Sequence, residues 1–181
     1  VIDTKKTDGV YLHICRMTGG VFSVGDTVKA EIDSVRRDAV RRNHSAAHLL
    51  QSALRSVLGN HVEQAGSYVD DSRVRFDFRH FSPMTPEQIE KTEAFVNEAI
   101  LSGTSVDNYE TSIEDAKKSG AIALFGEKYG QRVRVVKMGN WSIELCGGTH
   151  VSNTAKIGLF KIISESSVAA GIRRIEGTTG L

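Results

Sequence analysis

The chain has 181 residues, is 40% hydrophobic and 25% charged, and carries a formal net charge of +1. These values are typical of a globular protein with room for one core, or for one core and a small appended piece. No apolar run approaches the roughly 20 residues of a membrane-spanning helix. So small a net charge excludes a strong overall attraction to nucleic acid, so such a partner needs local patches of charge.

The first residues, VIDTKKTDGVYLH, lack the apolar segment of a signal peptide and begin without methionine. We therefore expect a piece of a longer chain. The two cysteines, Cys15 and Cys146, lie far apart and make a poor disulfide framework. That usage predicts a reducing, cytoplasmic setting.

Short strands separated by turns are predicted over residues 10–33, including the alternating apolar positions of VGDTVKAEID. A helix is predicted over 38–58, because apolar residues recur at helical spacing and Gly59-Asn60 supplies a stop. A hairpin should follow, with strands at 62–69 and 73–78 around an Asp-Asp-Ser turn.

A second helix should begin at Thr85 as N-cap, with Pro86 in its first turn and Gln88 closing a capping box, and should end near Leu101. Ser112 caps a short third helix that Gly120 ends. The remaining strands are predicted at 132–138, 141–145 and 159–164. Together these elements predict an α+β fold with a mixed, mainly antiparallel sheet and packed helices.

Two pairs of metal-binding residue types stand out in this chain. His44 and His48 lie four positions apart in the first predicted helix, and therefore on one face of it. Cys146 and His150 flank the two glycines of LCGGTH much later in the chain. Thiolate and neutral imidazole are ligands that zinc prefers, and glycines let a backbone approach a ligand closely. The pairs predict one zinc site, with either three or four protein ligands.

Two other kinds of zinc site do not fit. Ser45 stands where the protease pattern H-E-x-x-H has its glutamate base, and the cysteine spacing differs from that of a zinc finger. No Ser-His-Asp or Cys-His nucleophile arrangement is evident, and Cys146 serves better as a zinc thiolate. A core of this size needs no metal staple, which favours a functional ion.

Four stretches of the chain resemble one known family. They are RRNHSAAHLLQSALRSVLGNHVEQAGSYV, ALFGEKYGQRVRVV, SIELCGGTHV and GLFKIISESSVAAGIRRIEGTTG. In order and spacing they are similar to the editing domain of alanyl-tRNA synthetases, with related modules in threonyl-tRNA synthetases and in free-standing alanyl-tRNA trans-editing proteins. The resemblance implies that residues 1–36 end a β-barrel subdomain and that 37–181 form a zinc-containing editing domain.

The resemblance implies an aminoacyl-tRNA deacylase within an alanine-tRNA ligase. It would hydrolyse the ester joining serine or glycine to the alanine tRNA, while other synthetase domains supply recognition and aminoacylation. Such a site is needed because a pocket for alanine's methyl rejects glycine or serine by only about 1–3 kcal/mol. The resemblance assigns the zinc ligands as His44, His48, Cys146 and His150, and a direct attack by water would use Gln64, His44 and Cys146.

Substrate contacts are also implied by position. Gln64 matches a family pocket residue, while Ala47 stands where relatives often carry threonine, which leaves the recognition of serine open. Arg173 or Arg174 would contact the acceptor end of the tRNA. The stretch FGEKYG lacks the Gly-Lys-Ser/Thr ending of a P-loop, so no nucleotide-triphosphate site is expected.

Two other functions stay open on the sequence. One is a zinc-stapled tRNA-binding module without hydrolytic activity, and the other is a general metallohydrolase. Metal-dependent loss of ester hydrolysis in a folded protein would separate the first of these from the deacylase.

Overall fold

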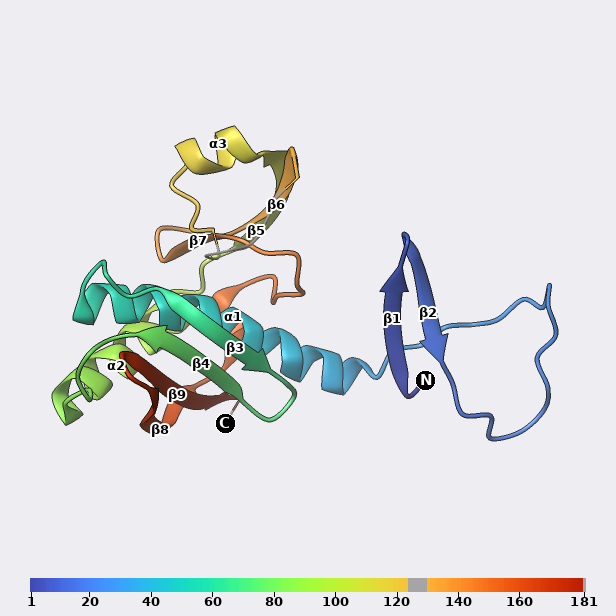
Figure 1. Ribbon diagram of the computed structural model, residues 1–181, viewed down its shortest axis with the longest axis horizontal. Coiled ribbons are helices and arrows are strands. Elements are labelled where there is room, and N and C mark those ends of the chain that lie inside the picture. The colour runs from blue at the N-terminus through green and yellow to red at the C-terminus, as the bar shows by residue number, and fades with distance from the viewer. Residues whose placement is uncertain (124–129, 181) are drawn as a thin grey trace. The chain divides into compact units, whose positions relative to one another are not determined.

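A computed structural model describes residues 1–123 and 130–180 of the chain (Figure 1). Most of the FGEKYG stretch lies outside these residues. The chain divides into two compact units, Val1–Ile32 and Asp33–Leu181. The assignment of residues 1–36 to a β-barrel subdomain remains a prediction.

The first unit is built on one antiparallel hairpin of β1 (Asp3–Thr7) and β2 (Val10–Ile14). Asp8 and Gly9 form its turn with positive φ angles of 48° and 82°, the conformation that two-residue hairpins favour. The strand predicted over VGDTVKAEID is wrong, and β1 was not predicted. Within the described residues no strand pairs with this segment, and an alternating pattern alone does not form a sheet.

The second unit contains two antiparallel sheets. One has the strand order β3-β4-β9-β8 and the other the order β5-β6-β7. The strands are β3 (Gln64–Val69), β4 (Val74–Arg79), β5 (Val106–Ser112), β6 (Arg132–Met138), β7 (Ser142–Leu145), β8 (Phe160–Ala169) and β9 (Ile172–Thr179). Together with the helices, they confirm the predicted α+β fold, and the described residues form no closed barrel.

The helices of this unit are α1 (Ser34–Leu58), α2 (Pro86–Leu101), the short α3 (Ile113–Lys118) and a 3₁₀ turn, η1 (Thr154–Ile157). The capping box predicted at α2 is confirmed: Thr85 Oγ1 accepts from the Gln88 N–H, and the Thr85 N–H donates to Gln88 Oε1. No described helix is long and apolar enough to cross a membrane.

Helix α1 begins one turn earlier than predicted. Asp33 caps it by accepting from the Arg36 N–H at 2.9 Å. The added turn is exposed and carries no apolar periodicity, so the pattern used to place the start of the helix does not reach it. Strands β5 and β9 were not predicted either, because polar and charged residues interrupt their alternation.

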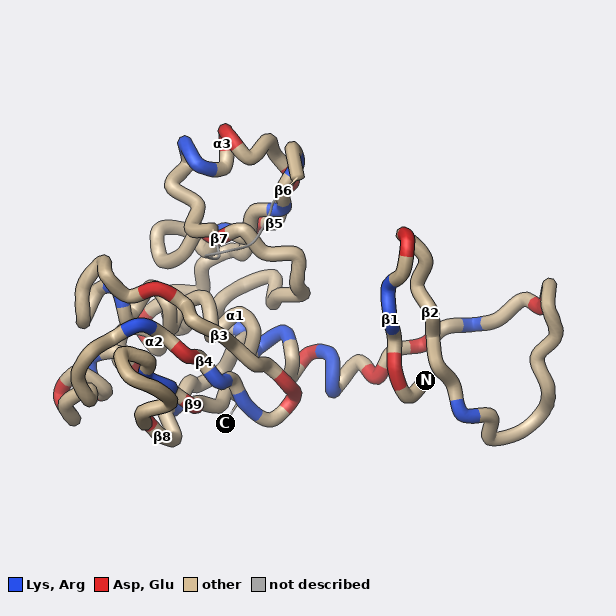
Figure 2. The backbone as a smooth tube through the Cα atoms, in the orientation of Figure 1, with Lys and Arg blue, Asp and Glu red and all other residues tan. Residues whose placement is uncertain are grey.

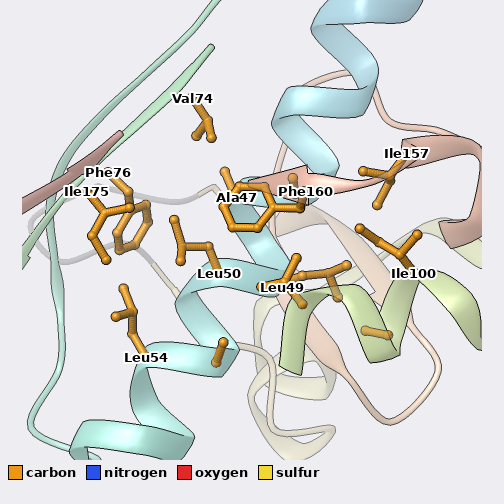
Figure 3. Packing of buried hydrophobic residues seen from close by; sticks show 14 of the residues in the cluster. Ala47, Leu49, Leu50, Leu54, Val74, Phe76, Ile100, Ile157, Phe160 and Ile175 are labelled. Atoms are coloured by element: carbon orange, nitrogen blue, oxygen red, sulfur yellow. The ribbon is translucent and has the colours of Figure 1, made fainter. Parts of the chain in front are cut away.

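The main core lies between α1, α2 and the four-stranded sheet. Figure 3 shows Leu50 and Leu54 of α1 beside Phe76 of β4 and Ile175 of β9, and all four side chains are at most 1% exposed. This packing fixes which face of α1 is buried. It therefore also fixes the direction of the polar side chains at the edge of that face.

Candidate metal centre

The structure brings the four predicted ligands together. His44 and His48 lie on α1, while Cys146 directly follows β7 and His150 comes four residues later. One ligand atom from each side chain lies within 4.8 Å of all the others. Among the described residues this is the one cluster of its kind. Two segments about 100 residues apart thus converge on a point that can hold a metal ion.

Two sulfur–nitrogen distances within the cluster suit a tetrahedral ion. The Cys146 Sγ atom lies 3.5 Å from His44 Nε2 and 3.4 Å from His150 Nε2. An ideal tetrahedron with Zn–N of about 2.05 Å and Zn–S of about 2.3 Å has N···S edges of about 3.6 Å. Three imidazoles and one thiolate are also a donor set of the kind found in four-coordinate zinc sites. The residues present therefore fit the ion.

The loop holding Cys146 and His150 closes against α1 through one glycine. A Cβ atom built on Gly148 would overlap the His44 ring, whereas one built on Gly147 would meet no atom within 4 Å. Of the two glycines in the motif, only Gly148 is therefore required by close approach. The Gly148 N–H also lies 3.4 Å from Cys146 Sγ, in position to donate to the sulfur.

Electrostatics favour a thiolate in this cluster. Burial raises the pKa of Cys146, but contacts with the three imidazoles outweigh it and lower that pKa to about 3. Burial lowers the pKa of His150 to about 4. Burial also opposes a charge on His48, yet the adjacent Glu144 carboxylate prevails and raises its pKa to about 10. Without metal, the site at neutral pH is therefore a thiolate beside an imidazolium.

Buried side chains orient the imidazoles. Glu144 is 5% exposed, and its Oε2 lies 2.8 Å from His48 Nδ1. Ser142 Oγ donates to Glu144 Oε1 at 3.1 Å. On the other side, Ser45 Oγ lies 3.2 Å from His150 Nδ1 and accepts from the Val151 N–H. In both cases a polar oxygen lies beside Nδ1, and Nε2 is left for the metal, the arrangement that commonly supports histidine ligands.

A small cavity of about 70 Å³ adjoins the cluster. It has room for about five water-sized positions, or for a group of a few heavy atoms. Ligands His44, His48 and Cys146 form part of its wall. Its other lining residues are Ala47, Gln51, Gln64, Ser67, Val69, Phe76, Glu144 and Leu145.

Both substrate residues predicted near the ligands line this cavity. Gln64 begins β3 at a bulge in its pairing with β4, and its Nε2 donates to Ser67 Oγ at 3.1 Å. Bulges of this kind commonly redirect a side chain beside a functional site. Ala47 is 6% exposed and contributes only a methyl group.

Gln51 also lines the cavity and is not among the residues predicted from the sequence. It is 2% exposed, and its Oε1 has no hydrogen-bond partner among the described residues. A buried carboxamide oxygen without a partner is unusual and marks a place where a ligand or water binds. Helical spacing contains a signal for it, since Gln51 lies three and seven residues after His48 and His44. Glu144 and Ser45 were likewise not predicted as supports of the ligands.

Arg173 and Arg174, predicted to contact tRNA, lie on β9 and do not line this cavity. Arg173 forms a two-pronged ion pair with Glu165, and Arg174 forms one with Asp77 at 2.7 and 2.8 Å. In each guanidinium, Nε and Nη2 are engaged within the sheet.

Residues 133–176 match the protein family described as the threonyl and alanyl tRNA synthetase second additional domain. That segment contains Cys146 and His150, so one of the two ligand pairs lies inside the matched segment and the other pair precedes it.

Similarity to individual proteins is stronger still and covers nearly the whole chain. The alanine–tRNA ligase of Pelotomaculum thermopropionicum is 55% identical over 177 residues, which is 98% of this chain and 20% of that protein. The alanine–tRNA ligase of Acetivibrio thermocellus is 59% identical over 99% of this chain and 21% of its own length. The alanine–tRNA ligase 1 of Lachnoclostridium phytofermentans is 59% identical over 99% of this chain and 20% of its own length.

The chain thus spans about a fifth of the length of these relatives. The resemblance seen in the sequence is confirmed: residues 133–176 match the second additional domain of threonyl and alanyl tRNA synthetases, and nearly the whole chain is similar to a segment of alanine–tRNA ligases.

Proposed function

We propose that this chain is the editing domain of an alanine–tRNA ligase and hydrolyses alanine tRNA mischarged with serine or glycine at a zinc site. One observation carries the proposal: four metal-binding side chains from distant segments meet beside a small cavity lined by two glutamines. The cytoplasm is the proposed setting, and mischarged tRNA and the remaining synthetase domains are the proposed partners.

The size and polarity of the cavity suit a small aminoacyl group. Its volume of about 70 Å³ accepts glycine or serine and leaves little space for larger side chains. Volume alone discriminates weakly among small amino acids, so polar contacts have to separate serine from alanine. The neutral polar side chains available to make them are the carboxamides of Gln51 and Gln64 and the hydroxyl of Ser67.

Gln51 is proposed to bind the serine hydroxyl, in the absence of a threonine at Ala47. Its Oε1 has no hydrogen-bond partner among the described residues, so a serine hydroxyl entering the cavity gives that group a hydrogen bond. Glycine leaves the same position free for a water molecule, which satisfies the amide equally. Alanine's methyl group fills the position without donating, which leaves the amide unpaired.

The hydrolytic step is proposed as a direct attack of water on the ester. Zinc bound by the four side chains would supply Lewis-acid chemistry at this point. Gln64 faces the same cavity and can both donate to and accept from the attacking water or the ester. Cys146 is committed to the thiolate form and to the metal, so no covalent intermediate on sulfur is invoked.

The deciding experiment is single-turnover hydrolysis of alanine tRNA charged with serine, glycine or alanine, with the protein in excess. The zinc-loaded chain should release serine and glycine and spare alanine. Cys146→Ala should lose both metal and hydrolysis, whereas Cys15→Ala, a change at the exposed cysteine of the first unit, should retain both. Undiminished hydrolysis by a metal-free Cys146→Ala protein would contradict a role for zinc.

A tRNA-binding module without chemistry would give a different result. It would bind tRNA without hydrolysing any of the three esters, even when loaded with zinc.

A change at Gln51 tests the recognition step separately: Gln51→Leu should slow release of serine about 100-fold, in the range for a missing hydrogen bond to a hydroxyl. Gln131→Leu, at an exposed glutamine, should not change it. Equal slowing for serine and glycine would argue that Gln51 only supports the fold.

A further inference from the structure

A second, larger cavity borders the metal centre at a different ligand. It measures about 530 Å³, within the range of about 300–1,000 Å³ typical of ligand sites. His150 forms part of its wall, while the other three ligands line only the small cavity. The two cavities share no lining residue. The larger one is lined by Asp38, Arg41, Arg42, His150, Val151, Ser152 and Lys156.

Positive charge dominates this cavity. Figure 2 shows Lys and Arg along the first turns of α1, which supply two of its cations. Arg41 forms an ion pair with Asp38 at 2.9 Å, so the single acid is already neutralised. Lys156 donates to Ser152 Oγ and has no carboxylate partner in the described part of the chain. Arg42 likewise forms no ion pair with any described residue.

Arg42 is held in place and lacks a partner. Its Nε is buried and makes no hydrogen bond within the described residues. The backbone of Gly180 packs so closely that a Cβ there would lie 2.9 Å from this Nε. The adjacent Asn43 ties α1 down, since its Nδ2 donates to the Asp70 carbonyl and its Oδ1 accepts from Thr179 Oγ1. The buried Nε and the close packing of Gly180 restrict this side chain more than solvent restricts an exposed arginine.

We propose that this cavity binds a backbone phosphate near the 3′ end of the tRNA, with Arg42 and Lys156 as its cations. The inference rests on the proposed function and gives the substrate a direction across the site. An aminoacyl-tRNA ester has a small amino acid on one side and nucleotide phosphates on the other. The small cavity takes the amino acid, the cationic cavity takes the phosphate, and the ester lies between them at the metal ligands.

Guanidinium and ammonium groups are the side chains that bind phosphate oxygens best. A fixed guanidinium loses little freedom when the phosphate binds, so it can contribute more affinity than a mobile one. The phosphate lies outside the reacting bonds, so removing either cation should raise KM and leave kcat unchanged.

The test compares seryl-tRNA with an ester of the same terminal nucleoside that carries no phosphate. Arg42→Ala and Lys156→Ala should each raise the KM for seryl-tRNA about tenfold, the effect of one charge-assisted hydrogen bond. Neither change should alter hydrolysis of 3′-O-seryl adenosine, which has no phosphate. The slope of log KM against log salt should fall by about 0.7 for each phosphate that the variant no longer neutralises. Arg132→Ala, which removes an exposed arginine from β6, is the charge-matched control and should have no effect.

Several results would overturn the proposal. If Arg42→Ala slowed hydrolysis of both esters equally, Arg42 would act in the fold or in the chemistry. If Arg132→Ala also raised the KM for seryl-tRNA, the effect would be one of overall charge. Lys156 is exposed, so its variant stays informative if Arg42→Ala fails to fold. If inorganic phosphate binds the wild-type protein and not Arg42→Ala, but KM for tRNA is unchanged, the cavity takes free phosphate instead.

Failure of the proposed function would be recognisable separately. In that case neither ester would be hydrolysed by the zinc-loaded wild-type chain. Binding of uncharged tRNA would then test the phosphate site alone: weaker binding by Arg42→Ala and Lys156→Ala than by Arg132→Ala would support it, and equal binding by all three would contradict it.

Discussion

The metal centre takes two ligands from a helix and two from a loop, and the two segments are held by different forces. On α1, periodicity alone puts His44 and His48 on one face, and the buried core fixes the direction of that face. In the loop, Cys146 and His150 are placed by contacts with other elements, through Gly148 and Ser45. The helical half is therefore encoded locally, whereas the loop half depends on tertiary structure.

The strongest way to break this arrangement is to separate the loop from the helix. Gly148→Ala places a methyl group on the His44 ring, so the loop has to move. We expect zinc affinity to fall at least 100-fold and hydrolysis to fall with it, as measured by competition with a chelator. The matched control is Gly147→Ala, where open space surrounds the new methyl group. Equal behaviour of the two variants would contradict close packing of loop and helix.

A smaller effect is expected from the support of the helical half. Glu144→Gln keeps the shape of the side chain and removes the charge that faces His48. Removing such a support typically costs about 10–100-fold in metal affinity. Glu110→Gln, at an exposed carboxylate on β5, is the control and should bind zinc as the wild type does. Unchanged affinity in Glu144→Gln would mean that helix geometry alone orients His48.

The smallest expected effect concerns the number of protons that the site releases when zinc binds. At pH 7 the metal-free site holds a Cys146 thiolate (pKa about 3), a neutral His150 (pKa about 4) and a protonated His48 (pKa about 10). Because zinc needs all its ligands deprotonated, binding should release about one proton, mainly from His48. Calorimetry in buffers of different ionisation enthalpy measures this number. Release of two or more protons would place a further proton on the thiol or on a second imidazole.

The same pKa values give the metal-free protein a pH dependence. The pKa of His48 is raised, so its pairing with Glu144 stabilises the fold fully below pH 6.5 and loses this effect as pH rises through about 10. The pKa of Cys146 is lowered, so its contribution is present above pH 9 and is lost as pH falls toward about 3. The unfolding free energy should therefore decline toward both extremes.

Sequence predicted the helical half of the site more completely than its surroundings. Spacing alone placed His44 and His48 on one face, and residue chemistry singled out Cys146 and His150. Gln51 has the same helical spacing, but the buried Oε1 that lacks a partner among the described residues is visible only in three dimensions. Glu144 is one residue of an ordinary strand pattern until folding places it against His48.

Basic residues were the least predictable part of the chain. Arg173 and Arg174 look available in the sequence, yet cross-strand carboxylates engage both. Arg42 looks like one of several arginines in a charged run, yet packing against Gly180 leaves its Nε buried and unpaired among the described residues. Whether an arginine is free depends on neighbours distant in the sequence, which a local pattern does not contain.

X-ray absorption on the zinc-loaded chain tests the convergence of the two segments most directly. Our account predicts one sulfur at about 2.3 Å and three nitrogens at about 2.0–2.1 Å from the ion. The sulfur should be absent from any zinc retained by Cys146→Ala. A shell of oxygen atoms without sulfur, or a wild-type chain that binds no zinc, would contradict the account.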